Sequence, residues 1–121
     1  MTPKTVLIIE DNEDIWLAAK TSLRKVCECI WASSAEKGLE IIHIKKPDVI
    51  LMDLQLPMMS GIELTQKLRA MDEYRNMVIM AFTASALPEQ KKEALDAGCN
   101  GIVSKPFTRK ELIEALEPYL S

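Results

Sequence analysis

Residues 48–61 read DVILMDLQLPMMSG, in which a continuous apolar run, Val49–Met52, ends at an aspartate and leads into a proline-containing turn. Similar short runs occur at Val6–Ile9, Met77–Phe82 and Ile102–Val103, with a weaker one around Cys29–Ala32. Apolar runs without alternation are typical of strands that helices cover on both faces, as in parallel sheets. The sequence therefore predicts an α/β fold with a five-stranded parallel sheet.

Helix-start signals lie between these runs. In a capping box, a Ser or Thr side chain and a Glu three residues later bond each other's backbone N–H groups. Three pairs fit this pattern: Ser33 with Glu36, Ser60 with Glu63, and Thr108 with Glu111. Pro88 is typical of a first helical turn, and Gly98 of the left-handed residue that ends a helix. We expect five helices alternating with the strands in a single domain, residues 1–121.

The chain has 121 residues and a formal net charge of −3, so it offers no basic field that would attract nucleic acid. It has no visible signal peptide or membrane-spanning apolar stretch, and we expect a cytoplasmic protein without membrane insertion. Cys27, Cys29 and Cys99 fit neither a zinc site nor a disulfide framework, and we interpret them as reduced, mostly structural thiols. We expect either a stand-alone domain or one excised from a longer protein.

Polar side chains stand at the ends of four predicted strands: Glu10-Asp11, Asp53, Thr83 and Lys105. The carboxyl ends of parallel strands share one edge of a sheet, so these groups are expected to converge. Three crowded carboxylates repel one another, and Mg²⁺, which prefers oxygen ligands, would remove that penalty. Thr83 and Lys105 could supply donors to the oxygens of a phosphoryl group.

Each of these residues also has a plainer interpretation. Acids after a strand are common helix caps, a single lysine is usually at the surface, and a strand-end threonine often caps the next helix. Their coincidence at one predicted sheet edge is what indicates a site. Pro106 adds to it, because a cis X-Pro bond in a tight turn would hold Lys105 at a fixed angle to the sheet edge.

At these residues the chain resembles the receiver domain of bacterial two-component response regulators, from about Thr5 to Leu120. The segments VLIIEDNED (6–14), DVILMDLQLPMMSG (48–61), VIMAFTA (78–84) and GIVSKPF (101–107) occur in the family's order and spacing. The resemblance implies a single flavodoxin-like, doubly wound domain with strand order 2-1-3-4-5. It also implies a phosphorelay protein that acts as a signalling switch rather than an enzyme, although it catalyses its own phosphoryl transfer and slow autodephosphorylation.

The family mechanism implies a role for each matching residue. Asp53 resembles the phosphoacceptor, which takes a phosphoryl group from a phosphohistidine on a sensor histidine kinase or a histidine phosphotransfer protein. Asp11 resembles the direct Mg²⁺ ligand, Glu10 a partner that holds the metal through water, and the Gln55 backbone carbonyl a further ligand. Lys105 would pair with the phosphoryl group.

Thr83 resembles the switch residue, whose hydroxyl moves onto the phosphoryl group with the following loop and so changes binding to a downstream protein target. Ala84 is small enough to leave room for that group, while Gln55 and Ser85 flank the entry. The family often has Tyr or Phe three residues before the lysine, but this chain has Ile102. We therefore expect the switch to depend on the loop after Thr83 and on repacking around Ile102.

Other functions remain as alternatives. An aspartyl-phosphate hydrolase would need an acid two residues after Asp53, where this chain has Gln55. A flavin or dinucleotide protein would need a glycine-rich loop where Glu10-Asp11 stands. A degenerate receiver that binds proteins independently of phosphate is the main alternative. The remaining tempting residues are interpreted as packing or surface groups: His43, Trp16, Trp31, Met58 and Met59.

Overall fold

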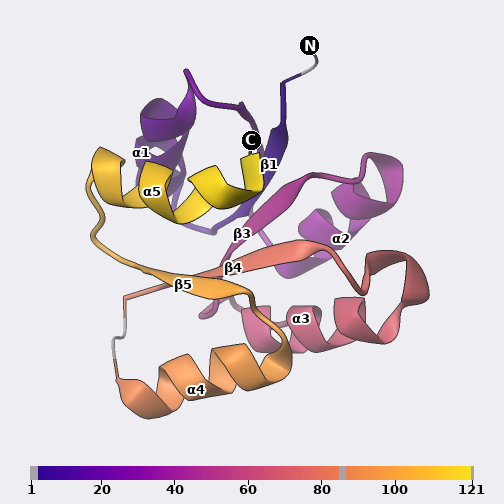
Figure 1. Cartoon of the computed structure of the whole chain (residues 1–121). Helices are drawn as coiled ribbons and strands as arrows, with labels where there is room; N and C mark the ends of the chain where they lie inside the picture. Colours follow the sequence, from indigo (N-terminus) through magenta and orange to yellow (C-terminus); the bar gives the residue numbers. More distant parts are fainter. Residues whose placement is uncertain (1–2, 85–86, 121) are drawn as a thin grey trace.

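A computed structural model describes residues 3–84 and 87–120, in which strands and helices alternate along the chain (Figure 1). The strands are β1 (Thr5–Ile9), β2 (Glu28–Ala32), β3 (Val49–Asp53), β4 (Val78–Thr83) and β5 (Gly101–Ser104). The helices are α1 (Glu13–Leu23), α2 (Ala35–Ile44), α3 (Gly61–Ala70), α4 (Pro88–Ala97) and α5 (Arg109–Leu120), with a short 3₁₀ helix at Asp72–Tyr74. Each predicted strand is present, and four of them extend one or two residues beyond their apolar runs. The fifth, β4, is shifted by one residue, so Met77 lies outside it and Thr83 within it.

All strand pairs are parallel, and the sheet order is β2-β1-β3-β4-β5. Helices α1 and α5 cover one face, while α2, α3 and α4 cover the other (Figure 1). This confirms the expected flavodoxin-like, doubly wound architecture. No helix among the described residues combines the length and the apolar character needed to cross a membrane.

The continuous apolar runs are explained by two cores, one on each face of the sheet. Along β1, Leu7 and Ile9 pack toward α2, α3 and α4, whereas Val6 and Ile8 pack toward α1 and α5. All four side chains are fully buried. A strand between two helical layers has no solvent-facing side, so successive side chains must all be apolar.

The helix-start predictions are confirmed at two of three boxes. Thr108 and Glu111 form both reciprocal bonds, at 3.1 Å from Glu111 N–H to Thr108 Oγ1 and 3.0 Å from Thr108 N–H to Glu111 Oε1. Ser60 Oγ accepts from Glu63 N–H at 3.2 Å. The third box is wrong by one residue, because the N-cap of α2 is Ser34 rather than Ser33.

Ser34 has extended backbone angles, and its Oγ accepts from the Lys37 N–H at 3.1 Å. With the helix starting after Ser34, Ala35, Gly38 and Ile42 lie on the buried side of α2. Core packing therefore outweighed the reciprocal bond that a start at Ser33 would have offered. Pro88 does lie in the first turn of α4, and Gly98 ends that helix with φ of 119°.

One glycine brings a helix close to the carboxyl edge of the sheet. Gly61 begins α3, and a Cβ placed on it would lie 2.4 Å from the Asp53 carbonyl oxygen and 2.9 Å from Leu54 Cα. These are backbone atoms that cannot swing away. The missing side chain thus lets α3 start directly beside the end of β3, where it closes the turn that follows Asp53.

Candidate functional site

Three carboxylates gather at the carboxyl edge of the sheet. Glu10 follows β1 and Asp53 ends β3, and these strands are neighbours with Ile9 opposite Met52. One carboxylate oxygen each of Glu10, Asp11 and Asp53 lies within 4.8 Å of the others. Glu10 is completely buried and Asp53 is 5% exposed, whereas Asp11 is exposed. The residues predicted to converge as a metal cluster therefore do so.

Lys105 reaches this cluster from the residue after β5. Its Nζ lies 2.7 Å from Glu10 Oε1 and 3.3 Å from Asp53 Oδ2, and its side chain is only 13% exposed. The ammonium also sits 5.0 Å from the centre of the Phe82 ring, which favours a cation over its face. The Lys105–Pro106 peptide bond is cis, an isomer that the sequence allowed but did not determine. A single lysine thus bridges two of the three acids.

The negative charge is only partly compensated. Oε2 of Glu10 is buried and has no hydrogen-bond donor among the residues that the structure describes. Burial raises the pKa of Glu10 from its ordinary value of 4.5 to about 7, and the neighbouring Asp53 carboxylate adds to this rise, while Lys105 opposes it. One ammonium among three carboxylates leaves room for another cation.

The donor set fits Mg²⁺. Hard divalent cations prefer carboxylate and carbonyl oxygens, and Mg²⁺ is usually held by one or two carboxylates together with water and phosphate. The orphaned Glu10 Oε2 would gain a positive neighbour, and exposed Asp11 gives access from solvent. The acidic cluster is therefore compatible with Mg²⁺ binding.

Asn12, rather than Glu10 or Asp11, is the N-cap of α1. Its side-chain Oδ1 accepts from the Ile15 N–H at 3.1 Å and caps α1. Glu10 and Asp11 lie outside that cap, on the side of Asp53 and Lys105. In the polar stretch after β1, Asn12 thus initiates the helix, whereas Glu10 and Asp11 belong to the acidic cluster.

The Asp53 carboxylate and Thr83 lie at neighbouring strand ends. Asp53 Oδ1 accepts from the Gln55 backbone N–H at 2.9 Å, which orients the carboxylate. Thr83 ends β4, is 3% exposed, and accepts at its carbonyl from the Lys105 N–H at 2.8 Å. Gln55 and Thr83 also line a hollow of about 370 Å³. Ser85, the other residue expected at the entry, lies outside the described residues.

The tryptophans were predicted to be packing groups, and Trp31 does more than pack. Its indole N–H donates to the Glu10 backbone carbonyl at 2.7 Å, while its ring stacks on Trp16 at 5.6 Å between centroids. Trp16 is 8% exposed, as expected of a core residue. No pattern in the sequence indicates this contact, because it depends on the rotamer that lets the indole reach the end of β1.

His43 has the structural role that we expected. Its Nδ1 lies 2.8 Å from the Tyr74 hydroxyl, and the two rings are 5.5 Å apart. Met58, in the turn after β3, is 91% exposed with φ of 66°, so it does not fill the core. The interpretation of Met58 as a packing residue is therefore wrong, because its side chain lies on the surface.

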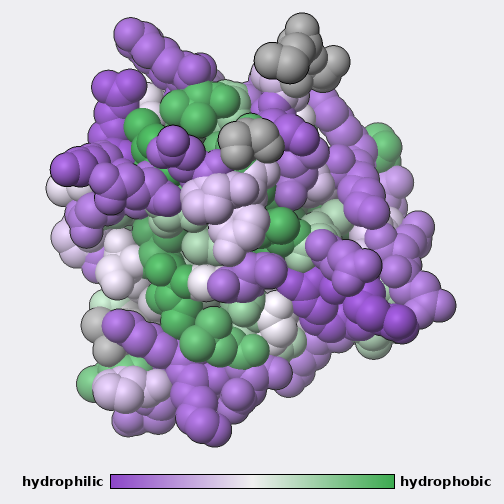
Figure 2. Space-filling view, viewed as in Figure 1, coloured by the Kyte–Doolittle hydropathy of each residue, from purple (hydrophilic) through white to green (hydrophobic). Residues whose placement is uncertain are grey.

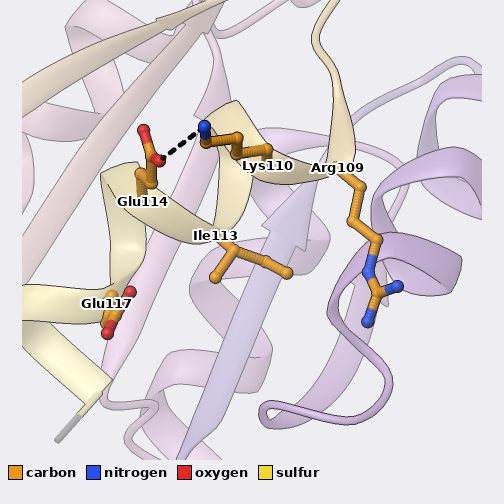
Figure 3. A pocket seen from close by; sticks show the side chains of 5 residues that line it. All are labelled: Arg109, Lys110, Ile113, Glu114 and Glu117. Atoms are coloured by element: carbon orange, nitrogen blue, oxygen red, sulfur yellow. Dashed lines mark ion pairs between the residues drawn. The ribbon is translucent and has the colours of Figure 1, made fainter.

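A shallow hollow of about 520 Å³ along α5 is not part of this site (Figure 3). Its lining includes Lys110 and Glu114, an i,i+4 pair 3.9 Å apart whose side chains are 83% and 61% exposed. Arg109 points away from this pair (Figure 3). Exposed pairs of this kind add little binding or stability, and the hollow is a solvated helix face.

Comparisons with known proteins agree with this geometry. A family model for the response regulator receiver domain matches residues 6–117. The polar-differentiation response regulator DivK of Brucella anthropi is 35% identical over 119 residues, which cover 98% of this chain and 97% of DivK.

Two solved structures are similar in both fold and sequence. The receiver domain of sensor histidine kinase PA1611 from Pseudomonas aeruginosa, with a magnesium ion coordinated in its active site cleft, has a TM-score of 0.89 and 29% identity over 98% of each chain. A chain in the Saccharomyces cerevisiae co-crystal structure of the histidine phosphotransfer protein Ypd1 and the Ssk1 receiver domain has a TM-score of 0.88 and 30% identity. That match covers 99% of this chain and 91% of the other.

Proposed function

The chain belongs to the response regulator receiver domain family of two-component signalling, and we propose on this premise that Asp53 accepts a phosphoryl group from a phosphohistidine. The observation that carries the proposal is the position of the Asp53 carboxylate between Lys105 and two further acids. A carboxylate so placed is oriented, partly shielded from water and provided with a cation for incoming phosphate oxygens.

The proposed transfer joins a carboxylate oxygen of Asp53 to phosphorus as the phosphorus–nitrogen bond to the donor imidazole breaks. The electron pair of that bond stays on the imidazole nitrogen, and an acyl phosphate forms on Asp53. The Gln55 N–H holds Asp53 Oδ1, and the Lys105 ammonium lies 3.3 Å from Oδ2, ready to pair with the arriving phosphoryl oxygens. Asp53 replaces the imidazole without needing a general base.

Mg²⁺ is the proposed cofactor, held by Glu10, Asp11, Asp53 and the backbone carbonyl of Gln55. When bound, it supplies positive charge to the phosphoryl oxygens as a Lewis acid. Glu10 and Asp11 keep the carboxylates close enough to share one cation, at oxygen separations within 4.8 Å for the three acids. Their mutual repulsion without a cation provides the driving force for loading the site.

A groove next to Lys105 suits a helical phosphodonor. About 450 Å³ of open space lies between α1, which contributes Ile15 and Ala18, and the segment after β5, which contributes Pro106 and Phe107. These apolar groups flank the mouth of the acidic cluster, so a helix seated there would bring a phosphohistidine to Asp53. Ypd1, named with the Ssk1 receiver in the similar complex, is a histidine phosphotransfer protein. We propose a protein of that class, or a sensor histidine kinase, as the donor.

The proposed output surface is the face formed by α4, β5 and α5. Apolar surface lies over β5 and the adjoining part of α4 (Figure 2), and it includes Leu95, which is 50% exposed, and the half-buried Ile102. Ile102 pairs with Ala81, two residues before Thr83. A shift of Thr83 toward a phosphorylated Asp53 would be felt at Ile102 through this pairing, and binding of a downstream protein would change.

The alternative function, a degenerate receiver that binds proteins without phosphate, predicts that no phosphoryl adduct forms on Asp53. Intact-protein mass would be measured after incubation with acetyl phosphate, with and without Mg²⁺, and then with a phosphorylated histidine phosphotransfer protein. We expect one labile, Mg²⁺-dependent phosphoryl adduct that Asp53→Asn abolishes. Asp96→Asn is the matched control, because Asp96 is exposed on α4 and pairs with Lys92. No adduct from either donor would favour the phosphate-independent module.

A further inference from the structure

Two thiols lie near the amino edge of the sheet, away from the acidic cluster. Cys27 immediately precedes β2 and Cys29 lies within it, so both stand near the start of the outermost strand. The acids stand at the opposite, carboxyl edge. Both cysteines are unoxidised; Cys27 is 7% exposed and Cys29 is half-buried. Residues two apart on an extended chain face the same side, and both thiols pack on the side of α1 and α5.

The thiols share a small hollow with charged groups. About 350 Å³ of space between the end of α1 and the start of β2 is lined by Cys27 and Cys29 together with Lys20, Arg24 and Glu28. The two cationic side chains come from α1 and the residue that caps it. Because both cysteines line this hollow, a small ion can reach their sulfur atoms there, and the two cations favour negative charge on sulfur.

The two thiols differ in acidity. Hydrogen bonding to Cys27 lowers the pKa of Cys29, and the charge of Lys20 contributes to this, while the same bond and burial raise the pKa of Cys27. Cys29 is therefore the more acidic of the two thiols, while the Cys27 thiol donates to the Leu23 carbonyl at 3.8 Å. Cys99 differs, because burial raises its pKa and its neighbour is Thr65.

We propose that Cys27 and Cys29 together bind a soft monovalent cation of the Cu(I) type, with one bond to each sulfur. Thiolates select soft cations over Mg²⁺ or Ca²⁺. Each sulfur binds as a thiolate and gives up any proton that it carries, so the complex of one monovalent cation with two thiolates has a single negative charge. Lys20 and Arg24, which line the same hollow, would offset that charge.

Other uses of the pair fit less well. A structural zinc site takes four ligands. Within residues 3–84 and 87–120, however, the only cluster of three or more potential His, Cys, Asp or Glu ligands is the acidic one, Glu10, Asp11 and Asp53. A disulfide would need an oxidant and would pull the sulfur atoms to about 2 Å. A two-coordinate cation needs only the two thiols that are present.

The test uses Cu(I) itself under anaerobic, reducing conditions, in competition with a chromogenic Cu(I) chelator. We expect one Cu(I) per wild-type chain. Cys27→Ser and Cys29→Ser should each weaken binding at least 100-fold, and Cys99→Ser should bind like the wild type. No phosphodonor or Mg²⁺ is present, so the result is independent of the proposed phosphoryl transfer. Failure of the wild type to compete, or equal loss in Cys99→Ser, would overturn the proposal.

Cys27 is buried, so its variant could lose binding by unfolding, and a second measurement avoids any mutation. Wild-type protein would be alkylated with iodoacetamide with and without Cu(I), and each cysteine followed by peptide mass. We expect Cu(I) to slow alkylation of Cys29 at least tenfold and to leave Cys99 unchanged. Unchanged labelling of Cys29, or loss of two hydrogens from Cys27 and Cys29 as a disulfide without bound metal, would contradict the proposal.

Discussion

Replacing Glu10 with glutamine should stabilise the protein in the absence of divalent cations. The Glu10 carboxyl is fully buried, Oε2 lacks a donor among the described residues, and burial beside Asp53 raises its pKa to about 7. Ionising such a group costs more in the folded than in the unfolded chain. Glutamine has a similar shape, can still accept from Lys105, and carries no charge.

The magnitude follows from linkage. A carboxyl whose folded pKa exceeds its unfolded value destabilises the fold once pH passes the unfolded value. For Glu10 the penalty begins near 4.5, grows as pH rises, and is complete above about 7. At about 1.4 kcal/mol per pH unit, the difference between these values corresponds to about 3 kcal/mol at pH 8. At pH 5 the penalty falls below about 1 kcal/mol by the same relation.

Urea unfolding in EDTA, followed by far-UV circular dichroism at pH 8 and pH 5, would measure this. With a slope of roughly 2 kcal/mol per molar, Glu10→Gln should raise the midpoint by about 1–2 M at pH 8 and much less at pH 5. Glu40→Gln, on the exposed side of α2, is the control and should change neither. Mg²⁺ should stabilise the wild type more than the variant. If Glu10→Gln is no more stable than wild type at pH 8, the account of the cluster is wrong.

Three further changes address the switch, the turn and the indole contact. Phosphorylated Thr83→Ala should bind the downstream target no differently from the unphosphorylated protein, while its phosphoryl adduct forms normally; an affinity change like that of wild type would contradict this. Gly61→Ala would place a Cβ 2.4 Å from the Asp53 carbonyl oxygen, so urea unfolding should show a loss of about 2 kcal/mol, against the usual helix preference for alanine. Trp31→Phe keeps a ring but removes the donor to the Glu10 carbonyl, which should cost about 1 kcal/mol in urea unfolding; unchanged stability would show that water replaces the indole.

The fold was predictable because its signals are local and repeat. The uninterrupted apolar runs could only suit a sheet covered on both faces, and the two cores on β1 and β3 explain them residue by residue. The strand order came from family resemblance rather than from pattern. The predicted start of α2 was wrong by one residue. The actual start is the one that buries Ala35 and Ile42, and this burial depends on tertiary packing.

The convergence of the site was predictable for a similar reason. Parallel strands align their carboxyl ends, so the strand-end positions of Glu10, Asp53 and Lys105 implied proximity. The sequence could not show which acid Lys105 would contact more closely; its Nζ lies 2.7 Å from Glu10 Oε1 and 3.3 Å from Asp53 Oδ2. Nor could it show the indole contact of Trp31, because a side chain's reach across strands depends on the rotamer that its neighbours allow.

The contact of Lys105 with both Glu10 and Asp53 suggests how a phosphoryl group on Asp53 would change the conformation. In the present state Lys105 is closest to Glu10, the most buried acid, and so reduces the repulsion within the cluster. A phosphoryl group on Asp53 would carry more negative charge than the carboxylate it replaces and would compete for the same ammonium. Movement of Lys105 toward it would also act on β4, because the Lys105 N–H bonds the carbonyl of Thr83. The ion pair and the proposed switch residue are thus connected through one backbone hydrogen bond, so a local exchange of partners can bias the loop that begins after Thr83.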